Sequence, residues 1–157
     1  QSEIVIDEQP GRISECPHEI VATVVAGGRL YQFTLLHLRG DDARAFFDAF
    51  LTAQDQLGGT VFVNAMTSAQ TGSNQIEAYR LYRPGEGYRI VAFTDNGERL
   101  GRVGSPPLTR NMTFNASKLP FWTGRLAVTN HLGVTTHVEG ASITLQIRQE
   151  PIYVRPE

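Results

Sequence analysis

The sequence predicts a mainly β protein, either an antiparallel β-sandwich or a closed β-barrel, with one packed α-helix over about residues 41–57. Short apolar or alternating runs, bounded by glycine and proline turns, predict the strands. One segment with apolar residues at spacings of three and four predicts the helix. The chain has a single cysteine, which excludes an internal disulfide, so the fold depends on its hydrophobic core.

Length and composition indicate one β-rich domain spanning residues 1–157. Hydrophobic residues make up 41% of the chain and charged residues 19%, which is typical of a folded globular protein. A chain of this size buries roughly two-thirds of its unfolded surface.

The predicted helix has a start signal, an apolar stripe and a stop signal. Asp41 or Asp42 can cap its N-terminus, and Gly58-Gly59 ends it. Because three phenylalanines fall in the stripe, we expect the helix to pack against a sheet. The stripe comprises Ala43, Phe46, Phe47, Phe50, Ala53 and Leu57.

Strands are expected on both sides of the helix. Gly27-Gly28 predicts a hairpin between strands over residues 19–26 and 30–38, and Asn96-Gly97 predicts another tight hairpin. The prolines at both ends of residues 151–156 indicate a tail rather than a strand. The remaining strands are expected at residues 60–66, 75–82, 88–94, 98–103, 124–130, 134–139 and 142–148, with a short one near Met112 and Phe114.

Charge and hydropathy limit the partners. The net charge of −2 argues against nucleic-acid binding, and no apolar stretch approaches the ~20 residues that span a membrane. Residues 1–60 carry a charge of −5 and residues 61–157 a charge of +3. This asymmetry favours contact between copies of the chain, or else neutralisation between neighbouring strands.

The clearest candidate metal site consists of His131, His137 and Glu139. On a strand, His137 and Glu139 share a face, and two imidazoles with a carboxylate are suitable zinc or iron ligands. The alternative is a solvated strand face. The sequence has no phosphate-binding glycine loop, Gly-x-Ser-x-Gly elbow, His-Glu-x-x-His motif or calcium loop, and no cofactor is expected.

Aromatic residues suggest a binding surface. Phe121 and Trp122 follow a proline and form a candidate anchor for a sugar or protein partner; the alternative is a plug that covers one end of the core. Arginines and tyrosines also lie together in one meander, which suits binding of single-stranded nucleic acid or another polyanion; the alternative is ordinary cross-strand pairing on a solvated sheet face. They include Arg80, Arg83, Arg89, Tyr79, Tyr82 and Tyr88.

Three short features bear on localisation. The chain begins at Gln1 rather than methionine, so we expect a processed, secreted or extracytoplasmic protein. Asn111 and Asn115 each begin an N-glycosylation sequon. The tripeptide Arg39-Gly40-Asp41 matches an adhesion motif, but Asp41 also suits the helix cap.

The leading functional hypothesis is a non-enzymatic structural or interaction subunit. It would be an exported surface protein or a component of a self-assembling particle or tube, with a protein partner or a homo-oligomeric state. The alternative is a β-barrel that binds a small apolar ligand, or an enzyme acting within that barrel. Its cavity would be lined by Tyr31, Phe33, Phe62, Tyr79 and Phe93.

Overall fold

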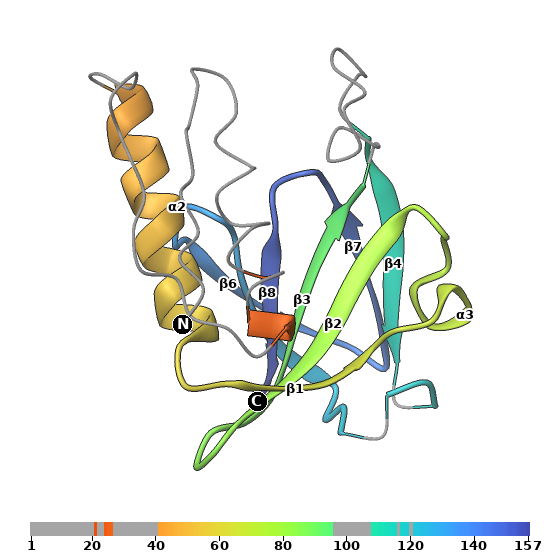
Figure 1. The fold of residues 1–157 in the computed structure, drawn as a ribbon. Coiled ribbons are helices and arrows are strands. Elements are labelled where there is room, and N and C mark those ends of the chain that lie inside the picture. The colour runs from red at the N-terminus through yellow and green to blue at the C-terminus, as the bar shows by residue number, and fades with distance from the viewer. Residues whose placement is uncertain (1–20, 22–23, 27–40, 96–107, 116, 120) are drawn as a thin grey trace.

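The architecture is an antiparallel β-sandwich with one long helix, seen in a computed structural model that describes residues 21, 24–26, 41–95, 108–115, 117–119 and 121–157 (Figure 1). A six-stranded sheet separates helix α2 from a two-stranded sheet. The large sheet has the order β1-β2-β3-β8-β5-β6, and the small sheet pairs β4 with β7. The elements are α2 (Asp41–Leu57), β1 (Val61–Ala65), α3 (Ser68–Thr71), β2 (Ile76–Arg83), β3 (Gly87–Thr94), β4 (Arg110–Asn115), β5 (Arg125–Thr129), β6 (Thr135–Glu139), β7 (Ser142–Ile147) and β8 (Ile152–Pro156).

Helix α2 covers one face of the large sheet, as its apolar stripe predicts. Phe46, Ala53 and Leu57 form a buried cluster with Val91 and Phe93 of β3. Phe47 belongs to the predicted stripe but is exposed, because adjacent helical residues point about 100° apart. Among the described residues, no helix is long and apolar enough to cross a membrane.

The hairpin between β2 and β3 holds the C-terminal end of α2. Arg83 donates a hydrogen bond to the backbone carbonyl of Asp55. Arg89 donates from Nη1 to the backbone carbonyl of Gln56 at 3.2 Å. The last carbonyls of a helix have no partner within it, and they favour a nearby positive charge. The last turn of α2 has no basic residue of its own, so the sheet supplies the cations.

The sequence did not predict strand β8. Residues 151–156 were expected to be a tail, yet β8 lies between β3 and β5 in the large sheet. Tyr153 and Val154 are buried on opposite faces of the sheet. Pro156 takes its place at the end of the strand, where a residue without an N–H is tolerated.

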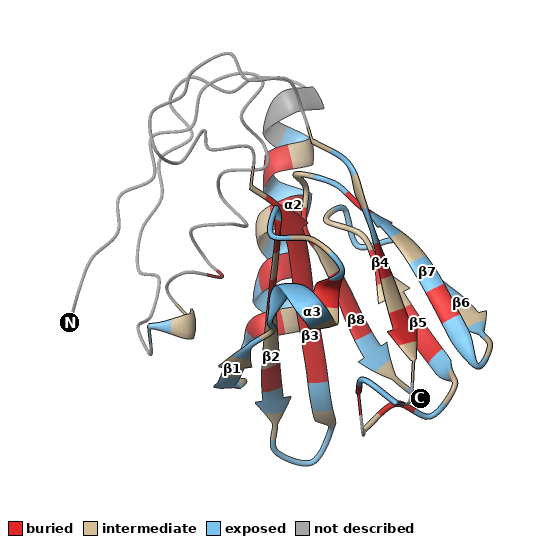
Figure 2. Ribbon diagram, turned by 90° about the vertical axis from the view of Figure 1, so that its right-hand side faces the viewer, coloured by how far each residue is buried: buried red, intermediate tan, exposed pale blue. Residues whose placement is uncertain are grey.

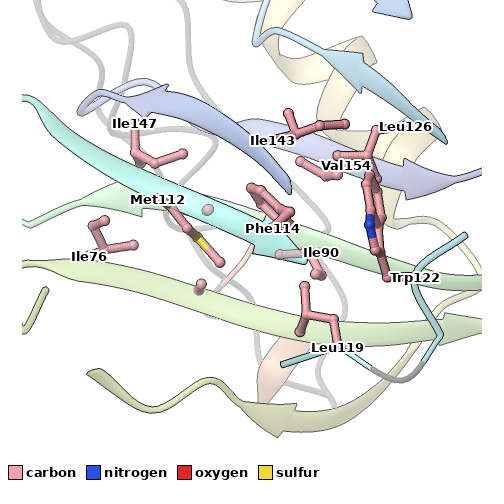
Figure 3. Packing of buried hydrophobic residues seen from close by; sticks show 12 residues of the cluster. Ile76, Ile90, Met112, Phe114, Leu119, Trp122, Leu126, Ile143, Ile147 and Val154 are labelled. Carbon is pink, nitrogen blue, oxygen red and sulfur yellow. The ribbon is translucent and has the colours of Figure 1, made fainter. Parts of the chain in front are cut away.

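A second core fills the space between the two sheets. Met112 and Phe114 of β4 and Ile143 and Ile147 of β7 point toward the large sheet. Figure 3 shows them packed with Ile90 and other residues of the large sheet. The short strand expected near Met112 and Phe114 is confirmed, and its pairing with β7 covers one face of the large sheet.

The structure decides between the two predicted architectures, because β1 and β6 are the edges of an open sheet. The closed barrel was therefore the wrong alternative. Phe93 packs in the core beside α2, with Tyr79 against the same cluster. Tyr31 and Phe33 lie outside the described residues.

The N-terminal expectation also needs correction. Residues 19–26 were predicted to be a strand, but Val21, Val24 and Val25 are helical. Together with Ile20 they are spaced as one face of a helix, and Val21 is buried against α2 and the sheet. The strands predicted at residues 30–38 and 98–103, the glycine pair at 27–28 and the hairpin at Asn96-Gly97 lie outside the described residues.

Candidate ligand-binding surface

Four side chains form what we call the aromatic–arginine surface: Arg80 and Tyr82 of β2, Tyr88 of β3, and Phe121 from the segment between β4 and β5. Alternate residues of a strand share a face. Arg80, Tyr82 and Tyr88 therefore lie on the face of the large sheet that packs against the small sheet. Other residues on this face of the same two strands are buried under the small sheet. Those buried residues are Ile76, Ala78, Ile90 and Ala92.

The register of the β2–β3 hairpin brings the two tyrosines together. Tyr82 lies directly opposite Tyr88, and their ring centroids are 5.3 Å apart with an edge-on angle of 64°. Tyr88 also stacks on Phe121, at 5.0 Å between centroids and 30° between planes. Tyr82 and Tyr88 remain 37% and 38% exposed. The three rings are thus in contact in the order Tyr82, Tyr88 and Phe121, and solvent reaches the two tyrosines.

Arg80 contributes a positive charge to these rings. Its guanidinium carbon lies 5.5 Å from the centroid of Tyr88 and 5.4 Å from that of Phe121. Both distances are within the range of a cation–π interaction. The rings therefore position the guanidinium without neutralising it.

The neighbouring arginines of the same hairpin are bound differently. Arg83 Nη1 lies 3.2 Å from Glu86 Oε2, and Arg89 also pairs with Glu86. Burial lowers the pKa of Arg89, as does the charge of Arg83, while Glu86 opposes this shift. These two arginines have structural partners, which distinguishes them from Arg80.

The predicted pair Phe121 and Trp122 is divided between surface and core. Phe121 is half-buried and belongs to the aromatic–arginine surface. Trp122 is buried in the second core, where its ring centroid lies 6.5 Å from that of Phe114 (Figure 3). Trp122 therefore packs in the core, as the alternative from the sequence expected, whereas Phe121 is only half-buried.

The predicted metal ligands are not brought together. His137 Nδ1 lies 3.0 Å from Glu157 Oε1, and Glu139 Oε1 lies 2.9 Å from Arg125 Nε. His131 lies in the turn before β6, where burial lowers the pKa of its imidazole and Glu150 opposes the shift. Within the described part of the chain, no three His, Cys, Asp or Glu side chains are grouped to hold a metal ion.

Sequence reasoning found most members of the aromatic–arginine surface but not their arrangement. The alternation of arginine and tyrosine on β2 and β3 was visible, and so was Phe121. Nothing in the sequence joined the two groups, because Phe121 lies more than thirty residues beyond Tyr88 and reaches it only through packing of the two sheets.

The fold defines the chain as an antiparallel β-sandwich domain. No protein-family model and no curated protein sequence matches it. Its fold is similar to part of α-galactosidase I from Mortierella vinacea, with a TM-score of 0.55, 7% identity and 96% of this chain covered. It is also similar to part of a β-L-arabinopyranosidase from Geobacillus stearothermophilus solved with arabinose, with a TM-score of 0.54, 7% identity and 90% coverage. The chain spans 37% and 30% of those two solved chains.

Proposed function

We propose that this chain is a non-enzymatic binding module and that its aromatic–arginine surface holds a saccharide. The observation that carries the proposal is the exposed cross-strand pair Tyr82 and Tyr88, whose rings continue onto Phe121. Tyrosine is enriched in binding surfaces because its ring is apolar and rigid while its hydroxyl forms hydrogen bonds. A sheet holds these rings in fixed positions, so little order is lost when a ligand binds.

The chemistry of the surface suits a sugar ring. A pyranose has a face of C–H groups that can lie on an aromatic ring and a rim of hydroxyls that tyrosine and arginine can bind. The two solved enzymes with a similar fold are named for galactose and arabinose substrates. The likeness supports the fold alone, but it makes oligosaccharides of these sugars the first to test.

Binding without catalysis is inferred from the composition of this surface. Its four residues include no carboxylate pair for acid–base chemistry and no nucleophile beside a base. The sequence also lacks the common catalytic motifs. An interaction role was the leading expectation from the sequence, and the exposed rings of this surface support a binding role of that kind.

The proposal predicts that Tyr88→Ala weakens saccharide binding at least about tenfold, because the central ring of the surface is lost. Isothermal titration calorimetry with galactose-, arabinose- and uronic acid-containing oligosaccharides measures the effect. Phe47→Ala, which removes an exposed aromatic ring from α2, is the matched control and should bind like the wild type. The proposal fails if the wild type binds none of these sugars, or if Tyr88→Ala binds equally well.

A second candidate function is self-association through β1. Three consecutive residues of this edge strand are exposed: Val61 at 55%, Phe62 at 39% and Val63 at 39% (Figure 2). Within the described residues, β1 pairs with β2 alone. An exposed apolar edge strand is a template for pairing with another chain.

For this candidate we expect the wild type to exceed the mass of one chain in light scattering at high concentration and to dissociate on dilution. Val63→Lys should remain monomeric, because a charge on an edge strand opposes strand pairing. Leu132→Lys, a matched change of another exposed apolar residue, should associate like the wild type. A wild type that stays monomeric at every concentration would remove this candidate.

A further inference from the structure

We propose that the saccharide bound at the aromatic–arginine surface carries a carboxylate, as a uronic acid does, and that the guanidinium of Arg80 receives it. This inference rests on the proposed function and names the ligand class of the same surface. It depends on three features of Arg80: its missing anionic partner, its fixed position and its place beside the exposed rings.

The first feature is that Arg80 has no protein anion to bind. In the described part of the chain, its contacts are with the rings of Tyr88 and Phe121, and no hydrogen bond or ion pair satisfies its guanidinium. Its Nε is shielded from solvent and has no hydrogen-bond acceptor there. Arg83 and Arg89, in contrast, share Glu86. The same hairpin thus pairs two of its arginines with one carboxylate and leaves the third without such a partner among the described residues.

The second feature is that the position of Arg80 is held. Its stem lies on the sheet opposite Ile90, and the two rings lie about equally far from its guanidinium carbon. A cation–π interaction engages the face of the guanidinium plane, whereas hydrogen bonds leave from its edge. The two rings thus contact the cation, and no described residue accepts a hydrogen bond from the Nε of Arg80.

The third feature is the distance between this cation and the exposed rings. The guanidinium carbon is 5.5 Å from the centroid of Tyr88, and the centroid of Tyr82 is 5.3 Å from that of Tyr88. In a uronic acid the carboxylate is attached directly to the sugar ring. A sugar ring lying on the tyrosines would thus place its carboxylate within reach of Arg80.

A carboxylate explains these features better than a neutral hydroxyl does. The planar guanidinium forms two parallel hydrogen bonds with a carboxylate, and such charge-assisted bonds are roughly twice as strong as neutral ones. The surface residues Arg80, Tyr82, Tyr88 and Phe121 carry no negative charge that would repel the ligand. The expected attraction is therefore both directional and electrostatic.

The test compares an oligogalacturonate with the same oligosaccharide after chemical reduction of its carboxyl groups, by isothermal titration calorimetry on the full chain. We expect the wild type to bind the oligogalacturonate at least about tenfold more tightly than the reduced form. This preference should decline as salt is added, because ions screen an exposed charge pair.

Arg80→Met retains an apolar stem without the charge and should bind both oligosaccharides equally. Arg80→Lys keeps the charge without the planar pair of donors and should show an intermediate preference. Arg125→Met, which removes an exposed arginine that pairs with Glu139, should keep the full preference. Circular dichroism establishes that each variant is folded, and Arg80→Lys provides the test if Arg80→Met is not.

The outcomes separate this inference from the proposed function. If the wild type binds both oligosaccharides equally through Tyr88, the carboxylate inference is wrong and the saccharide-binding proposal stands. If Arg80→Met or Arg80→Lys keeps the full preference for the oligogalacturonate, the inference is also wrong. If neither these oligosaccharides nor those of galactose and arabinose bind, both proposals fall.

Discussion

Phe46→Ala is expected to lower the free energy of unfolding by about 3–5 kcal/mol, the usual cost of truncating a fully buried phenylalanine. Phe46 is 0% exposed and packs with Leu81, Val91 and Phe93 between α2 and the large sheet. The substitution removes apolar contacts and leaves a cavity that the rigid sheet cannot readily fill. A domain of this size has only about 5–15 kcal/mol of net stability, so a large part of it would be lost.

The next residue provides the control for this prediction. Phe47→Ala is the same chemical change in the same helix, but Phe47 is 45% exposed. We expect it to cost less than about 1 kcal/mol. Urea denaturation followed by fluorescence of Trp122, the single tryptophan, measures both variants. Equal losses would mean that α2 does not present Phe46 to the sheet as described.

Trp122→Ala is expected to cost about 3–5 kcal/mol of stability, because it empties the second core at the point where Trp122 meets Phe114. Trp122→Phe should cost less than about 1.5 kcal/mol, because it retains most of the ring. It also removes an indole N–H that is buried without an acceptor among the described residues. Circular dichroism during urea denaturation follows both variants, since neither retains a tryptophan.

Phe121→Ala separates the core role of Trp122 from the proposed binding role of its neighbour. Phe121 is half-buried and stacks on Tyr88, so its loss should cost only about 1 kcal/mol of stability. If Phe121→Ala destabilises the protein as much as Trp122→Ala does, Phe121 is a core residue as well. In that case the aromatic–arginine surface is reduced to Arg80, Tyr82 and Tyr88.

Local patterns predicted most of the elements for identifiable physical reasons. The bounds of α2 follow from apolar residues at helical spacing and from the glycine pair after Leu57. The two strands of the β2–β3 hairpin were predicted from their residue pattern, and in the structure the turn between them contains Gly85 and Gly87, both with positive φ angles. Such signals lie within a few residues of each other, so they can be read without knowledge of the fold.

The errors occurred where a local pattern fits two structures. Ile20, Val21, Val24 and Val25 suit a strand buried on both faces, but they are also spaced like one face of a helix, and the described residues among them are helical. Strand β8 was not predicted because the prolines on either side of Tyr153 and Val154 indicated a tail outside the sheet. Its place between β3 and β5 depends on partners more than twenty residues away in sequence.

Residue types and spacings were enough to establish a mainly β chain with one sheet-packed helix, and to single out arginines, tyrosines and Phe121. Packing decided that the sheet is open, that Trp122 is internal and that His131, His137 and Glu139 remain separate. It also decided the partners of the arginines in the β2–β3 hairpin: Glu86 pairs with Arg83 and Arg89, whereas two aromatic rings contact Arg80. The physical reason is that a side chain's partner is set by the approach of distant strands, whereas its helical or strand tendency is set by its immediate neighbours.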